Sequence, residues 1–351
     1  MHGNHENGQE SIPFHTAVRQ TKRRRILPVF IPFLGCPGHC VFCAQDRQTG
    51  KKNASDIQSI LNDAYHSIIL QKFQAAMKNE LAFYGGTFTS LPHADRAACF
   101  SLLRTLREKG IVDSARCSTR PDALPPFVLE ELHRNGIGLV ELGIQSFNDD
   151  ALSLSRRGYS GTQAQNGCKA ILEHNLKLGI QLLPGMPGST PQIFLNDVRT
   201  AIDLSPSCLR FYPCLVPDGT ELADWFRKKI FLPWSLEETV KTLGEALKLA
   251  WQAQIPVIRL SVAPEMAFDS SLLAGPRHPA LGALIQAEAL LLSVEDALHA
   301  LGRSPRKLIL PKACQGFMYG DRGRLKPRWT SLGLGPEKLS FDEKSSTAVL
   351  S

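Results

Sequence analysis

Leu34-Gly35-Cys36-Pro37-Gly38-His39-Cys40-Val41-Phe42-Cys43 places three cysteines on one short segment, directly after the apolar run 26–33. Thiolates are soft metal ligands, and three on one loop can hold three corners of a metal centre and leave the fourth open. A closed zinc site needs a fourth ligand, usually from a second Cys/His pair, and none follows at the spacing of a ribbon or finger. The spacing therefore predicts an open metal centre.

The segments around this loop alternate between strand-like and helix-like patterns. Because runs of strand length separated by helical periodicity are typical of a parallel sheet or barrel, the fold class is predicted as α/β. Pro28 and Pro32 limit pairing of the first strand to one side or to its ends. The cysteine loop then lies at the carboxyl end of that strand, where such folds form their sites. The predicted strands are 26–33, 81–84, 115–118, 139–144, 178–183 and 209–213, and the predicted helices are 57–68, 97–106, 126–134, 162–174 and one that begins at Thr190-Pro191.

The alternation weakens toward the end of the chain. Ser235 and Glu238 predict a capping box for a sixth helix, and the apolar run 256–262 predicts a further strand. Residues 281–301 are predicted to be helical, and a basic tail with Gly and Pro follows. We therefore expect a flexible basic arm at 1–25, a barrel at 26–265 and a C-terminal extension at 266–351.

Composition bounds the class of protein. The chain has 351 residues, 43% of them hydrophobic, so it can bury a large core. It has neither an apolar run long enough for a membrane span nor a signal-peptide segment after Met1, and we expect a cytoplasmic protein without membrane contact. Nine cysteines with only three clustered fit a reducing compartment. A net charge of +7 favours an anionic partner such as RNA, although the basic run 22–25 could equally be a solvated lead-in to the first strand.

The cysteine spacing, with Phe42 before the third cysteine, is similar to that of the radical S-adenosylmethionine (SAM) superfamily. Motifs at the ends of the later strands resemble, within it, the Elongator catalytic-subunit branch, and most closely its shorter bacterial members that lack the acetyltransferase domain. The resemblance covers about residues 26–282 and implies a partial (β/α)6 TIM-type barrel with a small C-terminal appendage. These motifs are Gly85-Gly86-Thr87-Phe88, 118–122, 141–146, 183–188, 212–213, 219–222, 273–276 and His278-Pro279.

The resemblance also implies cofactors and roles. In this superfamily three cysteines bind three irons of a 4Fe-4S cluster, and SAM chelates the fourth iron. Cys36, Cys40 and Cys43 would be the cluster ligands. Phe42 would lie near the adenine, and the segment Gly85, Gly86 and Thr87 would line the methionine moiety. By similarity to the oxygen-independent coproporphyrinogen oxidases, Gln145, Arg157 and Gln181 would contact SAM. Gln181 stands where those oxidases carry an acid, and Arg156 beside Arg157 leaves the register open by one residue.

Other residues are open to two interpretations. Cys99, Cys117, Cys168 and Cys208 are expected to be small buried hydrophobic residues, whereas Cys214 and Cys314 are less clear. Arg120 and Asp122 could form a structural salt bridge or contact substrate. Glu141 could be a buried ion partner. The sequence singles out no acid or base catalyst.

The resulting hypothesis is a radical SAM enzyme that forms a deoxyadenosyl radical and abstracts hydrogen from an unknown substrate, with RNA, as in tRNA modification, preferred. It would need an electron donor such as flavodoxin or ferredoxin. One alternative is a tetrapyrrole or small-molecule radical reaction, and another is a non-enzymatic iron-sulfur protein that binds nucleic acid or senses redox state. The tail is too short for an ordinary acetyltransferase domain, but its cations could hold RNA or be solvated: Arg303, Arg306, Lys307, Lys312, Arg322, Arg324, Lys326 and Arg328.

Overall fold

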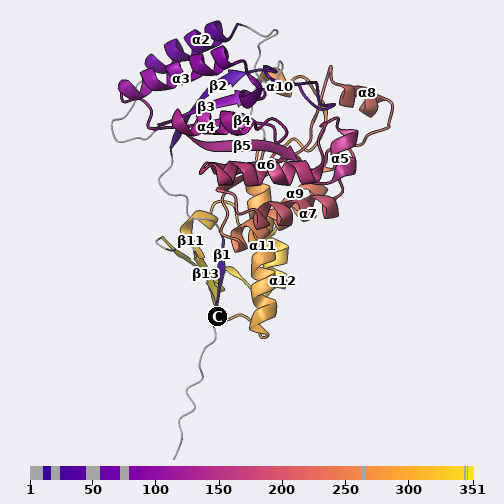
Figure 1. Cartoon of the computed structure of the whole chain (residues 1–351). Coiled ribbons are helices and arrows are strands. Elements are labelled where there is room, and N and C mark those ends of the chain that lie inside the picture. Colours follow the sequence, from indigo (N-terminus) through magenta and orange to yellow (C-terminus); the bar gives the residue numbers. More distant parts are fainter. Residues whose placement is uncertain are drawn as a thin grey trace, which may run out of the picture. The chain divides into compact units, whose positions relative to one another are not determined.

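The computed structural model describes residues 11–16, 24–44, 56–71, 79–261, 266–343, 345 and 347–351 (Figure 1). The chain divides into two compact units, each with a sheet of its own. The larger unit comprises Gln20–Leu236 and Ile258–Arg277, and the smaller comprises Met1–Arg19, Glu237–Val257 and His278–Ser351. The domain boundaries expected after residues 25 and 265 stay predictions.

The larger unit is built on a seven-stranded sheet with the order β2-β3-β4-β5-β6-β7-β9. Neighbouring strands from β2 to β7 pair in parallel, and the sheet curls into a half-barrel. This confirms the predicted partial TIM-type α/β fold. The strands are β2 (Arg25–Ile31), β3 (Asn79–Gly85), β4 (Ser114–Thr119), β5 (Ile137–Gln145), β6 (Lys177–Leu182), β7 (Cys208–Phe211) and β9 (Val257–Arg259).

Strand β2 lies at the edge of this sheet, where its proline is tolerated. It pairs with β3 over seven residues, and Pro28 stands opposite Ala82. Proline lacks the N–H that a second neighbour would need. The one-sided pairing predicted from Pro28 is therefore confirmed.

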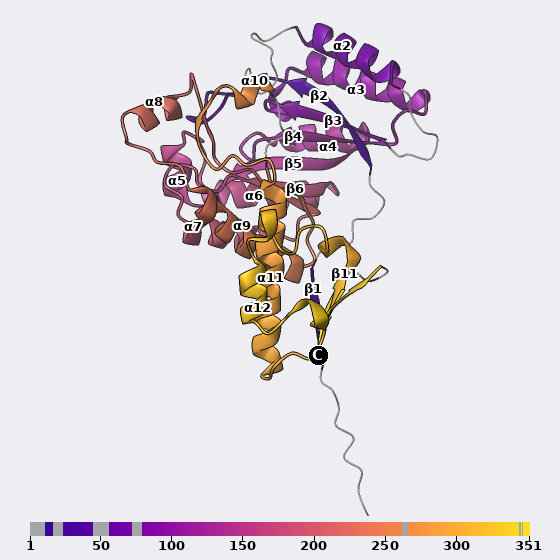
Figure 2. The same ribbon diagram turned by 180° about the vertical axis from the view of Figure 1, so that it is seen from behind.

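Helices alternate with the strands, and their starts follow local hydrogen bonding. Ser160 and Gln163 form a complete capping box at the start of α6, and Thr190 accepts from the Ile193 backbone N at 3.2 Å at the start of α7. Figures 1 and 2 both show α2 and α3 on one side of β2 and β3. The helices of this unit are α2 (Ile57–Ile69), α3 (His93–Glu108), α4 (Pro126–Arg134), α5 (Asp149–Leu154), α6 (Gly161–Glu173), α7 (Pro191–Asp203), α8 (Glu221–Arg227) and α10 (Met266–Asp269).

The sheet has an apolar face toward the helices and a polar face on the other side. Along β4, Ala115 and Cys117 are fully buried, whereas Arg116 and Ser118, which alternate with them, are half-buried. Alternate residues of a strand point to opposite faces. We call the side that carries Arg116 the polar face. The strands β8 (Val216–Pro217) and β10 (Leu272–Ala274) form a separate antiparallel pair.

The smaller unit combines a four-stranded sheet, in the order β1-β13-β11-β12, with the long helix α11. Figures 1 and 2 place α11 and α12 on one side of these strands. The strands of this unit are β1 (Ile12–His15), β11 (Leu308–Pro311), β12 (Leu339–Asp342) and β13 (Thr347–Leu350), and its helices are α9 (Leu236–Gln252), α11 (Leu281–Leu301) and α12 (Lys326–Ser331). The first residue of α9, Leu236, is assigned to the larger unit.

Strand β1 corrects part of the expected flexible arm. Residues 12–15 pair antiparallel with 347–350 at the other end of the chain, and the rest of the arm lies largely outside the described residues. A four-residue strand whose partner is more than 300 residues away leaves no local periodicity to detect. Among the described residues, no helix combines the length and apolar character that a membrane span requires.

Candidate cofactor site at the cysteine loop

The three clustered cysteines lie on the loop that follows β2, at the carboxyl end of the sheet. The loop turns sharply at Phe33, with φ of 56°, and at Gly35, with φ of 76°. The Cys36 N–H donates to the Phe33 carbonyl at 3.0 Å, and the Cys43 N–H to the Cys40 carbonyl at 3.0 Å. All three cysteine side chains are half-buried and form no disulfide. The three predicted cluster ligands thus share one loop at the end of the sheet where this fold forms its sites, although no three His, Cys, Asp or Glu side chains of the described residues are placed to hold a single metal ion.

The glycine turn after β3 packs directly on this loop. The Gly86 N–H donates to the Ile31 carbonyl at 2.8 Å, and the Thr87 N–H to the Leu34 carbonyl at 2.9 Å. A Cβ on Gly86 would stand 2.0 Å from the Leu34 oxygen, and a Cβ on Gly85, where φ is 117°, 2.6 Å from the Ile31 oxygen. Both glycines are therefore needed for the approach of two backbones. Their predicted contact with the methionine moiety stays a prediction.

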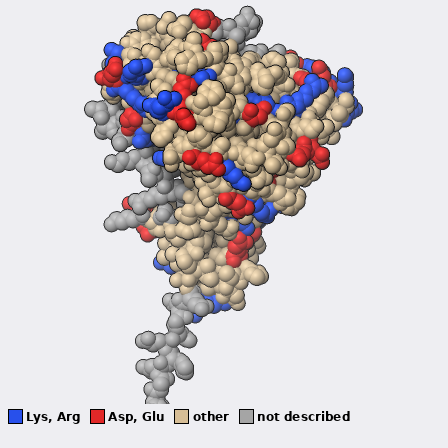
Figure 3. Space-filling model, viewed as in Figure 1, with Lys and Arg blue, Asp and Glu red and all other residues tan. Residues whose placement is uncertain are grey.

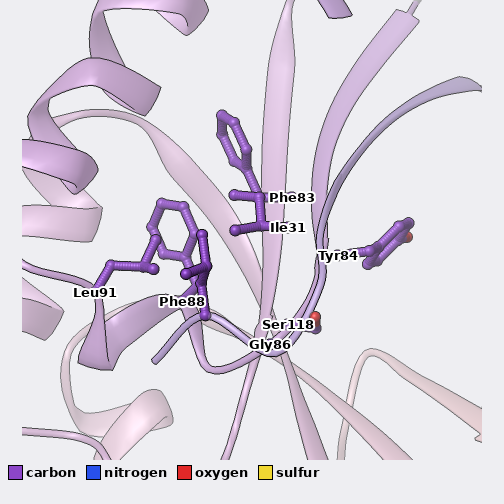
Figure 4. A pocket seen from close by; sticks show the side chains of 8 residues that line it. Ile31, Phe83, Tyr84, Gly86, Phe88, Leu91 and Ser118 are labelled. Carbon is purple, nitrogen blue, oxygen red and sulfur yellow. The ribbon is translucent and has the colours of Figure 1, made fainter. Parts of the chain in front are cut away.

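Thr87 links this turn to the first cysteine. Its hydroxyl oxygen lies 3.3 Å from the Cys36 sulfur, and the residue is completely buried. Figure 4 shows Phe83 and Phe88 on the apolar side of the turn and Tyr84 on the opposite side. The Phe83 and Phe88 rings stack at 5.1 Å, so the turn rests on a packed base.

Arg157 approaches the second cysteine from the loop after α5. Its Nη1 donates to the Cys40 sulfur at 3.0 Å, its Nη2 to the Gly143 carbonyl at 2.6 Å and its Nε to the Tyr159 hydroxyl at 2.9 Å. Burial lowers the pKa of Arg157, but Tyr159 and Cys40 outweigh it, and the net pKa is raised. The guanidinium is therefore a permanent cation beside a predicted ligand. Neighbouring Arg156 instead pairs with Glu221 at 2.6 Å, which favours the register that assigns the site role to Arg157.

Gln145 and Gln181 meet on adjacent strands. The Gln181 amide donates to the Gln145 side-chain oxygen at 3.4 Å. Gln145 is buried and has φ of 69°, and its carbonyl accepts from the Leu183 N–H at 2.9 Å. The two amides stand at the ends of β5 and β6. The structure thus places Thr87 against Cys36 and Arg157 against Cys40, with this glutamine pair at the same carboxyl end of the sheet.

Phe42 lies in a different environment from these polar residues. It packs against a buried apolar cluster that includes Val41 and Leu222, beside the half-buried Trp225 and Phe226 of α8. The Leu222 N–H donates to the Val41 carbonyl at 2.9 Å, which ties α8 to the cysteine loop. The placement of Phe42 near the adenine of SAM stays a prediction.

The six remaining cysteines are all buried. Burial raises the pKa of Cys99, Cys168 and Cys208 to about 12 and that of Cys314 to about 11. Because the thiolate is the form that binds metals, these thiols are poor ligands at neutral pH. The expectation that Cys99, Cys117, Cys168 and Cys208 are buried hydrophobic residues is confirmed, and Cys214 and Cys314 are buried as well.

A charged network on the polar face was not predicted beyond Glu141. Glu141 lies 2.8 Å from Arg116 Nη1 and 2.6 Å from Arg210 Nε, and Arg116 also pairs with Glu80. Arg210 donates to the Tyr84 hydroxyl at 2.6 Å. Two glutamates thus offset two arginines, and Glu141 is confirmed as a buried ion partner. Single polar residues inside otherwise apolar strands were the sequence signal for these positions.

Arg120 and Asp122 form the structural salt bridge that was one of their two interpretations. Two nitrogens of Arg120 donate to the two Asp122 carboxylate oxygens, each at 2.9 Å. Arg120 also donates to the Arg157 carbonyl, and its guanidinium lies 5.3 Å from the centre of the Tyr159 ring. The pair therefore supports the segment that carries Arg157. Tyr159 itself was not predicted from the sequence.

The turn after β5 rests on a buried carboxylate. Asp197 of α7 accepts from the Ser146 hydroxyl at 2.6 Å and from the Phe147 N–H at 2.8 Å. Burial raises the pKa of Asp197 to about 6, against the opposing effect of these two hydrogen bonds. The carboxylate thus fixes the segment that follows Gln145.

Two family models match the chain. The model described as the radical SAM superfamily matches residues 30–201, and the radical SAM C-terminal domain matches residues 206–290. The chain belongs to the radical SAM superfamily. This membership implies a 4Fe-4S cluster and SAM as cofactors. The chemistry of the donor set fits that expectation, because Fe-S clusters are held by cysteine thiolates and three cysteines stand here on one loop.

Curated relatives place the chain near the Elongator branch, which confirms the predicted resemblance. It is 29% identical over 189 residues to the tRNA uridine(34) acetyltransferase of Methanocaldococcus infernus, which covers 48% of this chain and 35% of that protein. It is 28% identical over 233 residues to the protein of the same name from Dehalococcoides mccartyi. The matched residues cover 57% of this chain and 51% of that protein. The chain thus spans about a third to a half of these relatives.

Two further comparisons concern another relative and the fold. The chain is 25% identical over 215 residues to the oxygen-independent coproporphyrinogen III oxidase of Escherichia coli, which covers 59% of this chain and 45% of that protein. The structure resembles that of archaeal Elp3 from Methanocaldococcus infernus with a TM-score of 0.58 at 20% identity, over 76% of this chain and 62% of that one. The structural likeness supports the fold.

Proposed function

We propose that this chain binds a 4Fe-4S cluster through Cys36, Cys40 and Cys43 and uses it to cleave SAM reductively. When bound, cluster and SAM together supply a deoxyadenosyl radical that abstracts hydrogen from a substrate. Membership of the superfamily supports an enzyme of this general class. The observation that carries the proposal is the contact of a buried cation, Arg157, with the sulfur of Cys40 on a loop that also carries Cys36 and Cys43.

The residues around the loop have distinct tasks in this proposal. The Thr87 hydroxyl and the Arg157 guanidinium contact two of the ligand sulfurs, which orients the loop. The amides of Gln145 and Gln181 can both donate and accept hydrogen bonds, as polar groups of SAM require. The glycine turn keeps the cysteine loop against the end of β3.

RNA is the substrate that we propose. Relatives named for tRNA uridine(34) and the net charge of +7 support it. A tetrapyrrole carries several carboxylates and would need unpaired cations, but Arg116 and Arg210 on the polar face already pair with Glu80 and Glu141. Figure 3 shows basic and acidic side chains interspersed on one face rather than gathered in one field. We therefore expect RNA contacts from local groups of cations.

Substrate dependence of SAM cleavage tests this proposal. The chain is reconstituted anaerobically with iron and sulfide, reduced with dithionite or with a flavodoxin or ferredoxin, and given SAM with either bulk tRNA or coproporphyrinogen. We expect deoxyadenosine above the background with tRNA, together with a mass change in a digested nucleoside. Stimulation by coproporphyrinogen alone would favour the tetrapyrrole alternative, and a cluster without SAM cleavage would favour the redox sensor.

A further inference from the structure

The Tyr159 hydroxyl is held in one orientation by its hydrogen-bond partners. The residue is 6% exposed, and its hydroxyl oxygen lies 2.9 Å from both the Gly143 and the Ile144 carbonyl oxygens. It also accepts from Arg157 Nε at 2.9 Å. A hydroxyl has one hydrogen to donate, and here that hydrogen faces two carbonyls while a lone pair receives the arginine.

These contacts fix the orientation of the Arg157 guanidinium. Nε is held by the hydroxyl and Nη2 by the Gly143 carbonyl at 2.6 Å, so the position of the planar group is set by two bonds on one side. The Nη1 corner then meets the Cys40 sulfur at 3.0 Å. Within the described part of the chain, three of the five N–H groups of the arginine have partners, which leaves two for an anionic ligand such as the SAM carboxylate.

A second guanidinium supports the tyrosine. The Arg157 and Arg120 guanidinium carbons lie 5.1 Å and 5.3 Å from the centre of the Tyr159 ring. Arg120 is held by both oxygens of Asp122 and donates to the Arg157 carbonyl. The salt bridge between Arg120 and Asp122 therefore fixes both the Tyr159 ring and the main chain of Arg157.

We propose that Tyr159 is a positioning residue that aims Arg157 at the Cys40 sulfur and thereby raises the reduction potential of the cluster. The inference rests on the proposed function, because it requires Cys40 to be a cluster ligand. A cation and an N–H donor at a ligand sulfur stabilise the added electron, and hydrogen bonds to the sulfurs are among the factors that set Fe-S potentials. This arrangement makes the cluster easier for its electron donor to reduce.

The reduction potential of the reconstituted chain tests the proposal. Tyr159→Phe removes the hydroxyl but keeps the ring, so Arg157 loses one of its two anchors. We expect the same iron content as the wild type but, at the potential where the wild type is half reduced, an about tenfold lower ratio of reduced to oxidised cluster, a shift of about 59 mV for a one-electron couple. Arg157→Gln removes the charge itself and should shift the potential at least as far in the same direction.

Tyr319→Phe is the matched control, because Tyr319 in the smaller unit also lies beside a cation, Lys326, at 5.6 Å. It should leave the potential unchanged. Unchanged potentials in Tyr159→Phe and Arg157→Gln, with normal iron content, would overturn the proposal. If Tyr159→Phe fails to take up iron, Arg157→Gln decides. If the wild type itself assembles no cluster, the proposed function fails first, and iron and sulfide analysis distinguishes that result from an unchanged potential.

Discussion

Gly86 and Leu34 approach each other more closely than any side chain larger than hydrogen permits. A Cβ on Gly86 would stand 2.0 Å from the Leu34 carbonyl oxygen, which belongs to backbone and cannot rotate away. Gly86→Ala should therefore destabilise the chain by about 1–3 kcal/mol, the usual cost of overpacking. Urea denaturation measures this change.

Gly38 on the cysteine loop provides the control for this substitution. Apart from its two neighbours in the chain, no residue that the structure describes has an atom within 4 Å of the position that its Cβ would take. Gly38→Ala should change the free energy of unfolding by less than about 0.5 kcal/mol. Equal losses in the two variants would contradict the role assigned to the close approach at Gly86.

Asp197 predicts a pH dependence of stability. Its pKa of about 6 in the folded chain lies above the ordinary value of 3.8, because the carboxylate is buried. The folded state therefore holds the proton more tightly between these pH values. The stability that this group contributes is complete below about pH 4 and is lost as the pH rises through 6, by about 2–3 kcal/mol at most.

Asp197→Asn removes this titration. The free energy of unfolding of the wild type relative to the variant should fall as the pH rises from 4 to 7, as urea denaturation at several pH values would show. Asp203→Asn, on the exposed side of the same helix, is the control. A difference between wild type and Asp197→Asn that does not change with pH would disprove the assignment.

Single residues differ in how far the sequence reveals them. The three cysteines could be predicted because their spacing on one loop is itself the feature. Arg157 was identified by resemblance, but its bond to Cys40 could not be, because it joins residues 117 apart in the chain. Tyr159 and Asp197 carried no sequence signal, since their roles arise from burial against segments distant in sequence.

At the scale of elements, the network across β3, β4, β5 and β7 predicts strong coupling between Glu141 and Arg210. Glu141→Gln leaves Arg210 without its buried carboxylate and should cost about 3–5 kcal/mol. Arg210→Gln should cost less, because Glu141 keeps Arg116 at 2.8 Å. In a double-mutant cycle the two substitutions should couple by about 0.5–3 kcal/mol.

Asp296 offers a comparison on the surface. It pairs with Lys248 at 2.7 Å, but its side chain is 53% exposed. Asp296→Asn should cost about 1 kcal/mol or less. Equal costs for Asp296→Asn and Glu141→Gln would show that the polar-face network is no more than a set of surface pairs.

The basic tail predicts how RNA binding depends on salt. Arg328 pairs with Glu288 and Glu295 at 2.7 Å and 2.9 Å, so we assign it to the fold, whereas Arg306, Lys307, Arg322 and Arg324 are exposed. The logarithm of the RNA-binding constant falls linearly with the logarithm of the salt concentration. The double substitutions Arg306→Ala/Lys307→Ala and Arg322→Ala/Arg324→Ala should each make this fall less steep, by about 0.7 in slope for each phosphate of single-stranded RNA that the variant no longer neutralises.

Two exposed cations of the larger unit, Lys109 and Arg134, supply the control. Their double alanine variant should keep the slope of the wild type in the same filter-binding series. If both tail variants also keep that slope, the tail is solvated and RNA must be held elsewhere or not at all.

The elements themselves could be predicted where their pattern is local. Between residues 26 and 213 the strands and all α-helices except α5 were anticipated because each has its own periodicity, and α11 was predicted with its observed bounds, Leu281–Leu301. Strand β1 was missed because its pairing with β13 joins the two ends of the chain. The short elements α5 and α8 were missed because six or seven residues give too little periodicity.

For the molecule as a whole, the proposed function requires a cluster that three cysteines leave incompletely ligated. The most direct measurement is the electron paramagnetic resonance spectrum of the anaerobically reconstituted, reduced chain before and after addition of SAM. We predict iron and sulfide in the stoichiometry of a 4Fe-4S cluster, a signal that changes on addition of SAM, and loss of both in Cys36→Ala/Cys40→Ala/Cys43→Ala. Bound zinc, or a cluster signal that SAM leaves unchanged, would contradict the account.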